Sequence, residues 1–296
     1  MFDPVRMGLF LPSVSPVATP EFLVAYAAAA EDAGFDSLWI GEHVVFVDEY
    51  SSKYPYSDDG RLGIPADSGM LELFSTLAFL ASTTERIRLG TAVCLVPQRN
   101  PVYTAKSVST IDWLSGGRLD FGVGIGWLRE EFAALNEPFE KRAQRTREYL
   151  GVMRTLWRDE VSSYDGDLYT LPSCRMFPKP LQAGGPPIYF GGETDAALRR
   201  VAELGDGWHG FNHLPDTAAA SVERLSGFLS EHGRSLSDID VTVCPYLKPA
   251  DPSHLSAYRD AGVDQLVLTA FAFDVDGARS TLGELGDAYV DAAASL

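Results

Sequence analysis

Apolar residues along the chain gather in short runs, and longer amphipathic segments separate these runs. The runs are rich in β-branched residues and are bounded by Gly, Pro or Asn, which is the pattern of buried strands. The intervening segments carry apolar residues at helical spacing, as Phe22, Leu23 and Tyr26 do after Pro20. The pattern predicts strands that alternate with helices, with the strands at residues 7–11, 37–40, 87–93, 119–123, 188–190, 207–211, 239–244 and 265–268.

The stretch 86–127 shows this alternation most clearly. Asn100 caps and Pro101 opens a predicted helix, and residues 115–117, Ser-Gly-Gly, stop it. A strand, a helix and a second strand of these lengths form a βαβ unit, which implies a parallel sheet covered by helices. Eight strands in 296 residues predict an α/β protein with an eight-stranded (β/α)8 TIM barrel, and a doubly wound open sheet is the alternative. Because no change of composition marks a linker, we expect a single domain over 1–296.

Composition narrows the class of protein. The chain is 46% hydrophobic and 22% charged, as expected of a globular protein with a large core. It has no run of 18 apolar residues and no signal-peptide pattern, so we expect a cytoplasmic protein that does not enter a membrane. The net charge of −17 disfavours nucleic acid as a partner. Cys94, Cys174 and Cys244 lack metal-binding spacing, so we expect no metal site.

The carboxyl ends of the predicted strands hold the candidate chemistry, because loops at that face of a barrel form its active site. By this rule, one mouth of the barrel is surrounded by His43 and the segments 93–99, 126–129, 191–194 and 209–213. His43 could exchange a proton near neutral pH, and a hydrogen-bonded structural histidine is the alternative.

A long polar insertion at residues 44–69 follows the second strand. Loops of this length are commonly lids or binding loops. Its tyrosines make either a pocket wall or an inert surface excursion, and we expect Tyr54 to line a substrate pocket together with Trp127.

Two glycine-rich segments end strands at the mouth. In the first, Gly124 and Gly126 follow Gly122, and Trp127 stands where a dinucleotide-binding motif would need its next glycine, so that motif is disfavoured. Glycines that alternate at a strand end can instead leave one face of the sheet bare for a flat group.

The second segment is Gly191-Gly192-Glu193-Thr194, directly before a helix. It predicts a phosphate seat at the helix N-terminus, and a tight turn with an ordinary cap is the alternative. The carboxylates of Glu193 and Asp195 would repel a phosphate unless they turn away from it.

A positive cluster opens the long helix that we predict over 139–158. It contains Lys141, Arg142, Arg145 and Arg147, and it is either a solvated helix face or a means of recruiting an anionic cofactor. The chain lacks the GxSxG, HExxH and P-loop motifs. A mouth of glycines, one histidine and aromatic residues suits a bound organic cofactor that performs the chemistry itself.

These residues resemble the bacterial luciferase-like oxidoreductases, which use FMN or coenzyme F420. The segments that carry the resemblance are GLFLP at 8–12, EDAGFDSLWIGEH at 31–43, RIRLGTAV at 86–93, NPVYTAK at 100–106, LSGGRLDFGVGIGWLREEF at 114–132 and PPIYFGGETDAALRRVAELGDGW at 186–208. The resemblance implies the luciferase-like barrel and a cis peptide bond at Ala92-Val93 behind the flavin ring. It also implies a phosphate on residues 191–194 and a ring edge near His43, Gly124 and Gly126.

The segments WLREEF and EKRAQRTREYL resemble the actinobacterial deazaflavin-dependent subgroup of this family. The resemblance implies hydride transfer between F420 and a small organic substrate, with His43 polarising that substrate or supplying a proton. Trp127 stands where the sugar-phosphate dehydrogenases of the family have a glutamate, so we expect a hydrophobic substrate instead. The alternatives are an FMN-dependent monooxygenase that uses reduced flavin and O2, and a non-catalytic flavin-binding relative. The partners that the family suggests are a flavin or deazaflavin reductase and a second copy of the chain in a homodimer.

Overall fold

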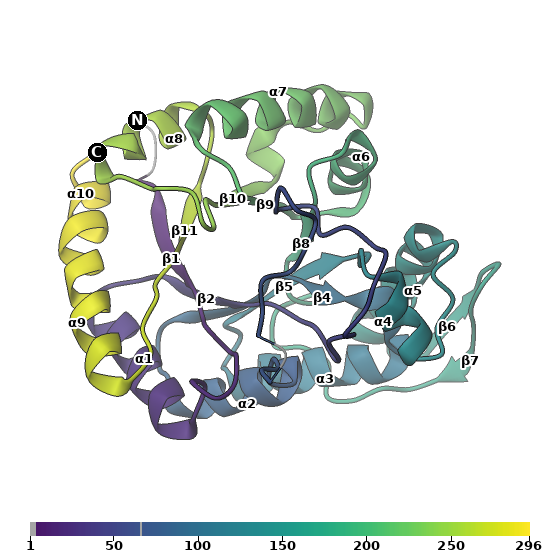
Figure 1. Cartoon of the computed structure of the whole chain (residues 1–296). Coiled ribbons are helices and arrows are strands. Elements are labelled where there is room, and N and C mark those ends of the chain that lie inside the picture. The colour runs from purple at the N-terminus through teal and green to yellow at the C-terminus, as the bar shows by residue number, and fades with distance from the viewer. Residues whose placement is uncertain (1–3, 66) are drawn as a thin grey trace.

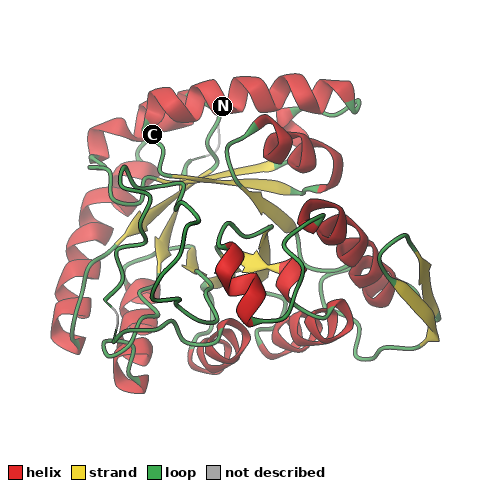
Figure 2. Ribbon diagram, turned by 45° about the vertical axis from the view of Figure 1, so that its right-hand side comes forward, coloured by secondary structure: helices red, strands yellow, loops and turns green. Residues whose placement is uncertain are grey.

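A closed parallel barrel forms the centre of the computed structural model, which describes residues 4–65 and 67–296 (Figures 1 and 2). Hydrogen bonding joins the strands in the order β3-β2-β1-β11-β10-β9-β8-β5, and a pairing of β3 with β5 closes the ring. This confirms the predicted eight-stranded barrel. Its strands are β1 (Arg6–Phe10), β2 (Ser37–Ile40), β3 (Arg88–Thr91), β5 (Leu119–Gly124), β8 (Ile188–Gly191), β9 (Gly207–Phe211), β10 (Asp240–Cys244) and β11 (Gln265–Thr269).

Helices surround the barrel, and side chains cap several of them as predicted (Figure 1). The side chain of Asn100 accepts hydrogen bonds from the N–H groups of Val102 and Tyr103, and Thr19 caps the first helix. The helices are α1 (Pro20–Asp32), α2 (Leu73–Thr83), α3 (Pro101–Leu114), α4 (Arg129–Ala134), α5 (Arg142–Arg158), α6 (Asp195–Leu204), α7 (Pro215–Glu231), α8 (Leu255–Asp260), α9 (Val275–Leu285) and α10 (Asp291–Ala294).

Two differences from the predicted helices lie between β5 and α5. The predicted helix 139–158 begins only at Arg142, because Lys141 has a left-handed φ of 56°, which a helix does not accept. The short helix α4 was not predicted, since six residues are too few for a helical period to show. Beyond α5, β6 (Ser162–Asp165) and β7 (Thr170–Cys174) form an antiparallel hairpin that projects from the barrel (Figure 2).

The predicted third strand, 87–93, is divided. β3 ends at Thr91, and pairing with β5 resumes at β4 (Cys94–Leu95). The Ala92-Val93 peptide bond between them is cis, as predicted. A Cβ on Gly122 would lie 1.8 Å from the carbonyl oxygen of Thr91, and one on Gly124 would lie 2.4 Å from Cγ2 of Val93. Our interpretation of a bare sheet face was therefore wrong at these glycines, since they accommodate a bulge of the chain itself.

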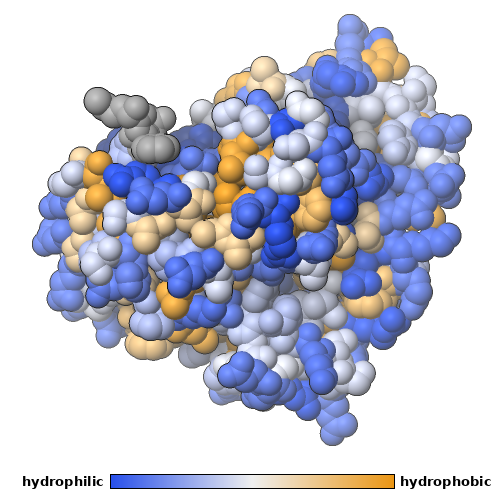
Figure 3. Space-filling model, turned by 90° about the horizontal axis from the view of Figure 1, so that it is seen from above, coloured by the Kyte–Doolittle hydropathy of each residue, from blue (hydrophilic) through white to orange (hydrophobic). Residues whose placement is uncertain are grey.

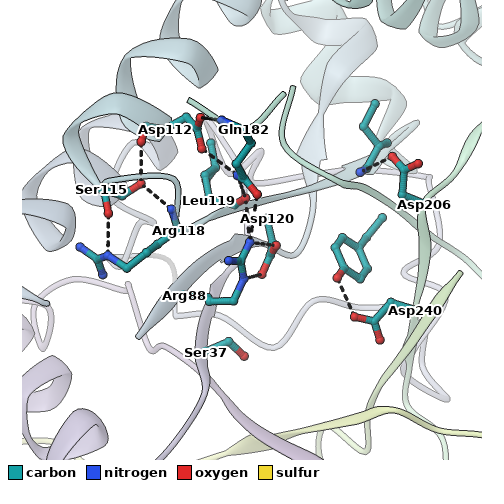
Figure 4. A network of polar contacts seen from close by, with 12 residues as sticks. Ser37, Arg88, Asp112, Ser115, Arg118, Leu119, Asp120, Gln182, Asp206 and Asp240 are labelled. Carbon is teal, nitrogen blue, oxygen red and sulfur yellow. Dashed lines mark hydrogen bonds and ion pairs between the residues drawn. The ribbon is translucent and has the colours of Figure 1, made fainter. Parts of the chain in front are cut away.

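Polar side chains at the amino ends of the strands bond to one another, as Figure 4 shows. Nε and Nη2 of Arg88 lie 2.8 and 2.5 Å from the carboxylate of Asp120. The Asp240 carboxylate accepts a 2.8 Å hydrogen bond from the hydroxyl of Tyr189 and a 2.5 Å bond from Arg6. These groups pair with one another at the end of the barrel opposite the mouth.

One face of the molecule is predominantly polar. On the face that Figure 3 shows, hydrophilic residues dominate and hydrophobic residues gather in a few small groups. Among the described residues, no helix combines the length and the apolar character that crossing a bilayer requires.

Candidate active site at the barrel mouth

His43 follows β2 and pairs with a carboxylate from α4. Its Nδ1 lies 3.1 Å from Oε2 of Glu131, and the side chain of Glu131 is fully buried. The same carboxylate accepts hydrogen bonds from the backbone N–H of Val44 at 2.7 Å and from Nε2 of Gln98 at 3.1 Å. The sequence did not single out Glu131, although it stands within the WLREEF segment.

The three donors decide the charge of Glu131. Burial by itself would raise the pKa of Glu131, but the hydrogen bonds from His43, Gln98 and Val44 outweigh it and hold that pKa below its ordinary value. The group is therefore a carboxylate at neutral pH, and we assign the hydrogen on His43 to Nδ1, which faces it. Nε2 of His43 makes no hydrogen bond to the described part of the protein and is free to exchange a proton.

A second buried carboxylate, that of Glu42, lies next to His43 in the chain and joins the end of β2 to the segment 95–99. Glu42 accepts hydrogen bonds from the Leu95 N–H at 2.6 Å and from Nε of Arg99 at 2.9 Å, and Arg99 also contacts Glu72 at 3.0 Å. These bonds tie the end of β2 to β4 and to the turn that carries Gln98. The positions of His43 and of the Glu131 partners are thus set by one polar network.

The described part of the insertion 44–69 packs against Trp127, whose ring contacts His43. The ring centroids of Trp127 and His43 are 5.8 Å apart, and those of Tyr54 and Trp127 are 5.3 Å apart. Oγ of Ser52 donates a 2.7 Å hydrogen bond to Glu130 of α4, which anchors the insertion. The insertion is thus not an inert surface excursion, and Tyr54 contacts Trp127 as expected; that the two line a substrate pocket stays a prediction.

The segment Gly191 to Thr194 has the geometry of a helix start. Gly192 has a φ of +105°, which favours glycine, and Oγ1 of Thr194 accepts the Ala197 N–H at 3.2 Å. A Cβ on Gly191 would lie 3.1 Å from Cγ1 of Val93, so the cis bulge and this segment are neighbours.

Glu193 and Asp195, whose carboxylates would repel a phosphate at this segment, both have partners within the protein. Glu193 turns toward the insertion and accepts hydrogen bonds from the hydroxyl of Tyr56 at 2.9 Å and from the Phe211 N–H at 3.1 Å. Burial raises the pKa of Glu193. Asp195 lies 2.8 Å from Nη1 of Arg224. The backbone at the start of α6 is therefore not opposed by these two groups.

Two residues that were predicted to lie at the mouth, Gly126 and His209, have structural roles instead. A Cβ on Gly126 would lie 2.7 Å from the ring of Phe132, so packing and its φ of +75° both require glycine there. His209 was placed at the mouth, which was wrong, because its side chain is buried inside the barrel with its ring centroid 4.8 Å from that of Trp39. Burial lowers the pKa of His209 to about 3, so the ring is neutral.

A protein-family model and several known sequences match most of this chain. The family model described as luciferase-like monooxygenase matches residues 5–267. An uncharacterized protein of Mycobacterium tuberculosis is 33% identical over 214 residues, which cover 72% of this chain and 73% of that protein. A 5,10-methylenetetrahydromethanopterin reductase of Archaeoglobus fulgidus is 29% identical over 215 residues, which cover 73% of this chain and 56% of the reductase.

Solved structures share the whole fold at low sequence identity. Monooxygenase RslO1 from Streptomyces bottropensis has a TM-score of 0.77 at 18% identity, with 97% of this chain and 99% of that chain covered. An F420-dependent secondary alcohol dehydrogenase, in complex with an F420-acetone adduct, has a TM-score of 0.76 at 17% identity, covering 98% and 99%. The oxygenating constituent of 3,6-diketocamphane monooxygenase from Pseudomonas putida, in complex with FMN, has a TM-score of 0.72 at 15% identity, covering 97% and 98%.

The chain belongs to the luciferase-like monooxygenase family. Members of this family are oxidoreductases and monooxygenases, which places the protein in the oxidoreductase class.

Proposed function

We propose that this protein is a deazaflavin-dependent oxidoreductase that transfers a hydride between coenzyme F420 and a small, mainly apolar organic substrate. The observation that carries the proposal is the pairing of His43 with the buried carboxylate of Glu131 next to the Trp127 ring. A proton-exchanging group beside an aromatic wall suits a reaction in which a cofactor handles the hydride and the protein handles the proton.

The residues of the mouth fit an anionic cofactor. Gly192, Thr194 and the backbone N–H of Glu193 would hold its phosphate at the start of α6, where backbone N–H groups and the helix dipole favour an anion. The bulge at Ala92-Val93 would support its ring, with Gly124, Gly126 and Gly191 close by. The orientation of Glu193 and Asp195 away from this seat supports the assignment.

The reaction divides between cofactor and protein. When bound, the deazaflavin ring accepts or delivers a hydride. Nε2 of His43 takes the hydroxyl proton while the substrate carbon loses its hydride, and it returns that proton to the carbonyl oxygen in the reverse direction. Glu131 keeps Nδ1 protonated and stabilises the positive charge that the ring gains. Trp127 and Tyr54 would pack against the apolar part of the substrate and exclude water.

Fluorescence titration of the purified protein with F420 and with FMN tests the proposal. We expect F420 to bind and to be reduced when a substrate such as a secondary alcohol is added. Absence of F420 binding would refute the proposal.

The second candidate function is an FMN-dependent monooxygenase. Two of the similar structures are monooxygenases, one of them in complex with FMN. In this case FMN alone would bind, and O2 would be consumed only when a partner reductase supplies reduced flavin. If either cofactor binds but no turnover occurs, the protein is instead a non-catalytic flavin-binding relative.

A further inference from the structure

A half-buried arginine without a partner lies on α6, on the side that faces α5. Arg200 makes no hydrogen bond or ion pair with the described residues, and its Nε atom is inaccessible to solvent. Burial lowers the pKa of Arg200, and repulsion from Arg142 and Arg147 of α5 lowers it further. A buried polar group without a partner in a folded protein calls for an explanation, and an anion that binds there is one.

The arginine cluster, defined as Arg142, Arg147 and Arg200, extends from the glycine-rich end of β5. Arg142 is the first residue of α5, and its Nε donates a 3.1 Å hydrogen bond to the carbonyl oxygen of Gly126. No carboxylate of the described residues forms an ion pair with Arg142. One end of the cluster therefore lies beside the mouth.

Contacts between the two helices show which way these side chains face. Arg147 forms an ion pair with Glu203 of α6, and Nη2 of Arg154 donates a 2.5 Å hydrogen bond to the Leu204 carbonyl oxygen. The helices thus lie side by side, as in Figure 1. Arg199, the neighbour of Arg200 in the sequence, instead pairs with Glu231 of α7 at 2.5 Å.

Arg145, which also belongs to the predicted positive cluster, has a different role. Its guanidinium is buried and donates to the carbonyl oxygens of Pro138 and Glu140 at 2.6 and 3.2 Å. Those bonds support the turn before α5. Arg145 is therefore a structural residue, and Arg142 and Arg200 are the members of the arginine cluster without a carboxylate partner among the described residues.

We infer that the arginine cluster binds a second anionic group of the cofactor, beyond the phosphate at the start of α6. Arg200 follows Asp195 by five residues, which places its Cα about 7.5 Å further along the helix axis. The cluster and the phosphate seat are therefore separate, and occupying both requires a ligand with several negative charges. The anionic tail of F420 provides such charges, whereas FMN carries one phosphate. This inference rests on the proposed function.

Arg200→Gln tests the inference, with Arg199→Gln as a control that makes the same charge change on the side of α6 that faces α7. We expect Arg200→Gln to raise the Kd for F420 about 10-fold or more, the loss of one charge-assisted hydrogen bond, and to change the Kd for FMN less than about threefold. Arg199→Gln should leave both constants within about twofold. Without ligand, Arg200→Gln should melt at an unchanged or higher temperature, because it removes a half-buried charge that has no described partner.

Other results would overturn the inference. One is an equal effect of the two variants on F420, and another is an equal loss of F420 and FMN in Arg200→Gln. If the wild type binds neither cofactor, the proposed function fails, and citrate, a tricarboxylate, then tests the cluster alone. Citrate that stabilises wild type and Arg199→Gln against heat but not Arg200→Gln supports the anion site, and equal stabilisation of all three overturns it.

Discussion

Glu131→Gln is the substitution that most directly tests the site, since it preserves shape and removes charge. The carboxylate accepts hydrogen bonds from three donors: Nδ1 of His43, Nε2 of Gln98 and the Val44 N–H. An amide has one acceptor oxygen and an NH2 group, so at least one of these donors would face another donor. The residue is fully buried, so water cannot replace the missing acceptor.

The magnitude follows from this count. A buried donor left unsatisfied costs about 1–3 kcal/mol, and the free energy of unfolding should fall by that amount. The His43 ring also loses the negative charge that stabilises its protonated form. A charge-assisted hydrogen bond contributes about 1.5–3 kcal/mol, against about 1 kcal/mol for a neutral one, so turnover should decrease roughly 2- to 30-fold.

The pH dependence of stability gives an independent readout. The pKa of Glu131 is lowered by folding, so its contribution to stability is complete above the ordinary glutamate pKa of about 4.3 and disappears as the pH falls through the lower value in the folded protein. The stability difference between wild type and Glu131→Gln should therefore shrink below about pH 4.

Urea denaturation at pH 7 and at pH 3.5, F420 titration and turnover are the assays. Glu140→Gln is the control, because that carboxylate is 69% exposed and pairs only with Arg129 among the described residues. It should leave stability, affinity and turnover unchanged. Wild-type turnover in Glu131→Gln, together with wild-type stability, would refute the role assigned to this carboxylate.

Three further substitutions address the other side of the mouth and the histidine. His43→Ala should lower turnover about 10²–10⁴-fold with little change in cofactor Kd, and unchanged turnover would make His43 structural. Gly192→Glu should raise the cofactor Kd at least about 10-fold in binding titrations, because it places a carboxylate at the phosphate seat; equal Kd and equal melting temperature would put the phosphate elsewhere. Tyr56→Phe removes the 2.9 Å bond to Glu193, so thermal melting should show a loss of about 0.5–1.5 kcal/mol, and an unchanged melting temperature would mean that this contact does not hold the insertion.

The barrel could be predicted because its signals are local. Each strand is a short apolar run, and caps such as Asn100 lie within a few residues of the N–H groups they bind. The cis bond at Ala92-Val93 was predicted from family resemblance and not from the pattern of the residues. The division of the third strand there depends on Gly122 in another strand, so it was not predicted from the third strand alone.

The partners within the site could not be predicted in the same way. Glu131 lies 88 residues after His43, and their pairing exists only because β2 and the loop after β5 end at the same face of the barrel. Arg200 and Arg142 belong to different helices, and the sequence singles out Arg142 within a positive cluster but shows Arg200 as an ordinary charged position. Which charges remain unpaired depends on the three-dimensional arrangement of every neighbour.

The same arrangement explains how a chain with a net charge of −17 can offer a site to an anion. At physiological ionic strength the Debye length is about 8 Å, so exposed carboxylates at greater distances are largely screened. A ligand at the start of α6 therefore responds mainly to the groups nearest to it. Glu193 is directed to Tyr56, and Asp195 is paired with Arg224, whereas Arg200 has no described partner. In the proposed site, the pairing of these few side chains, more than the overall charge, would therefore decide whether an anionic cofactor binds.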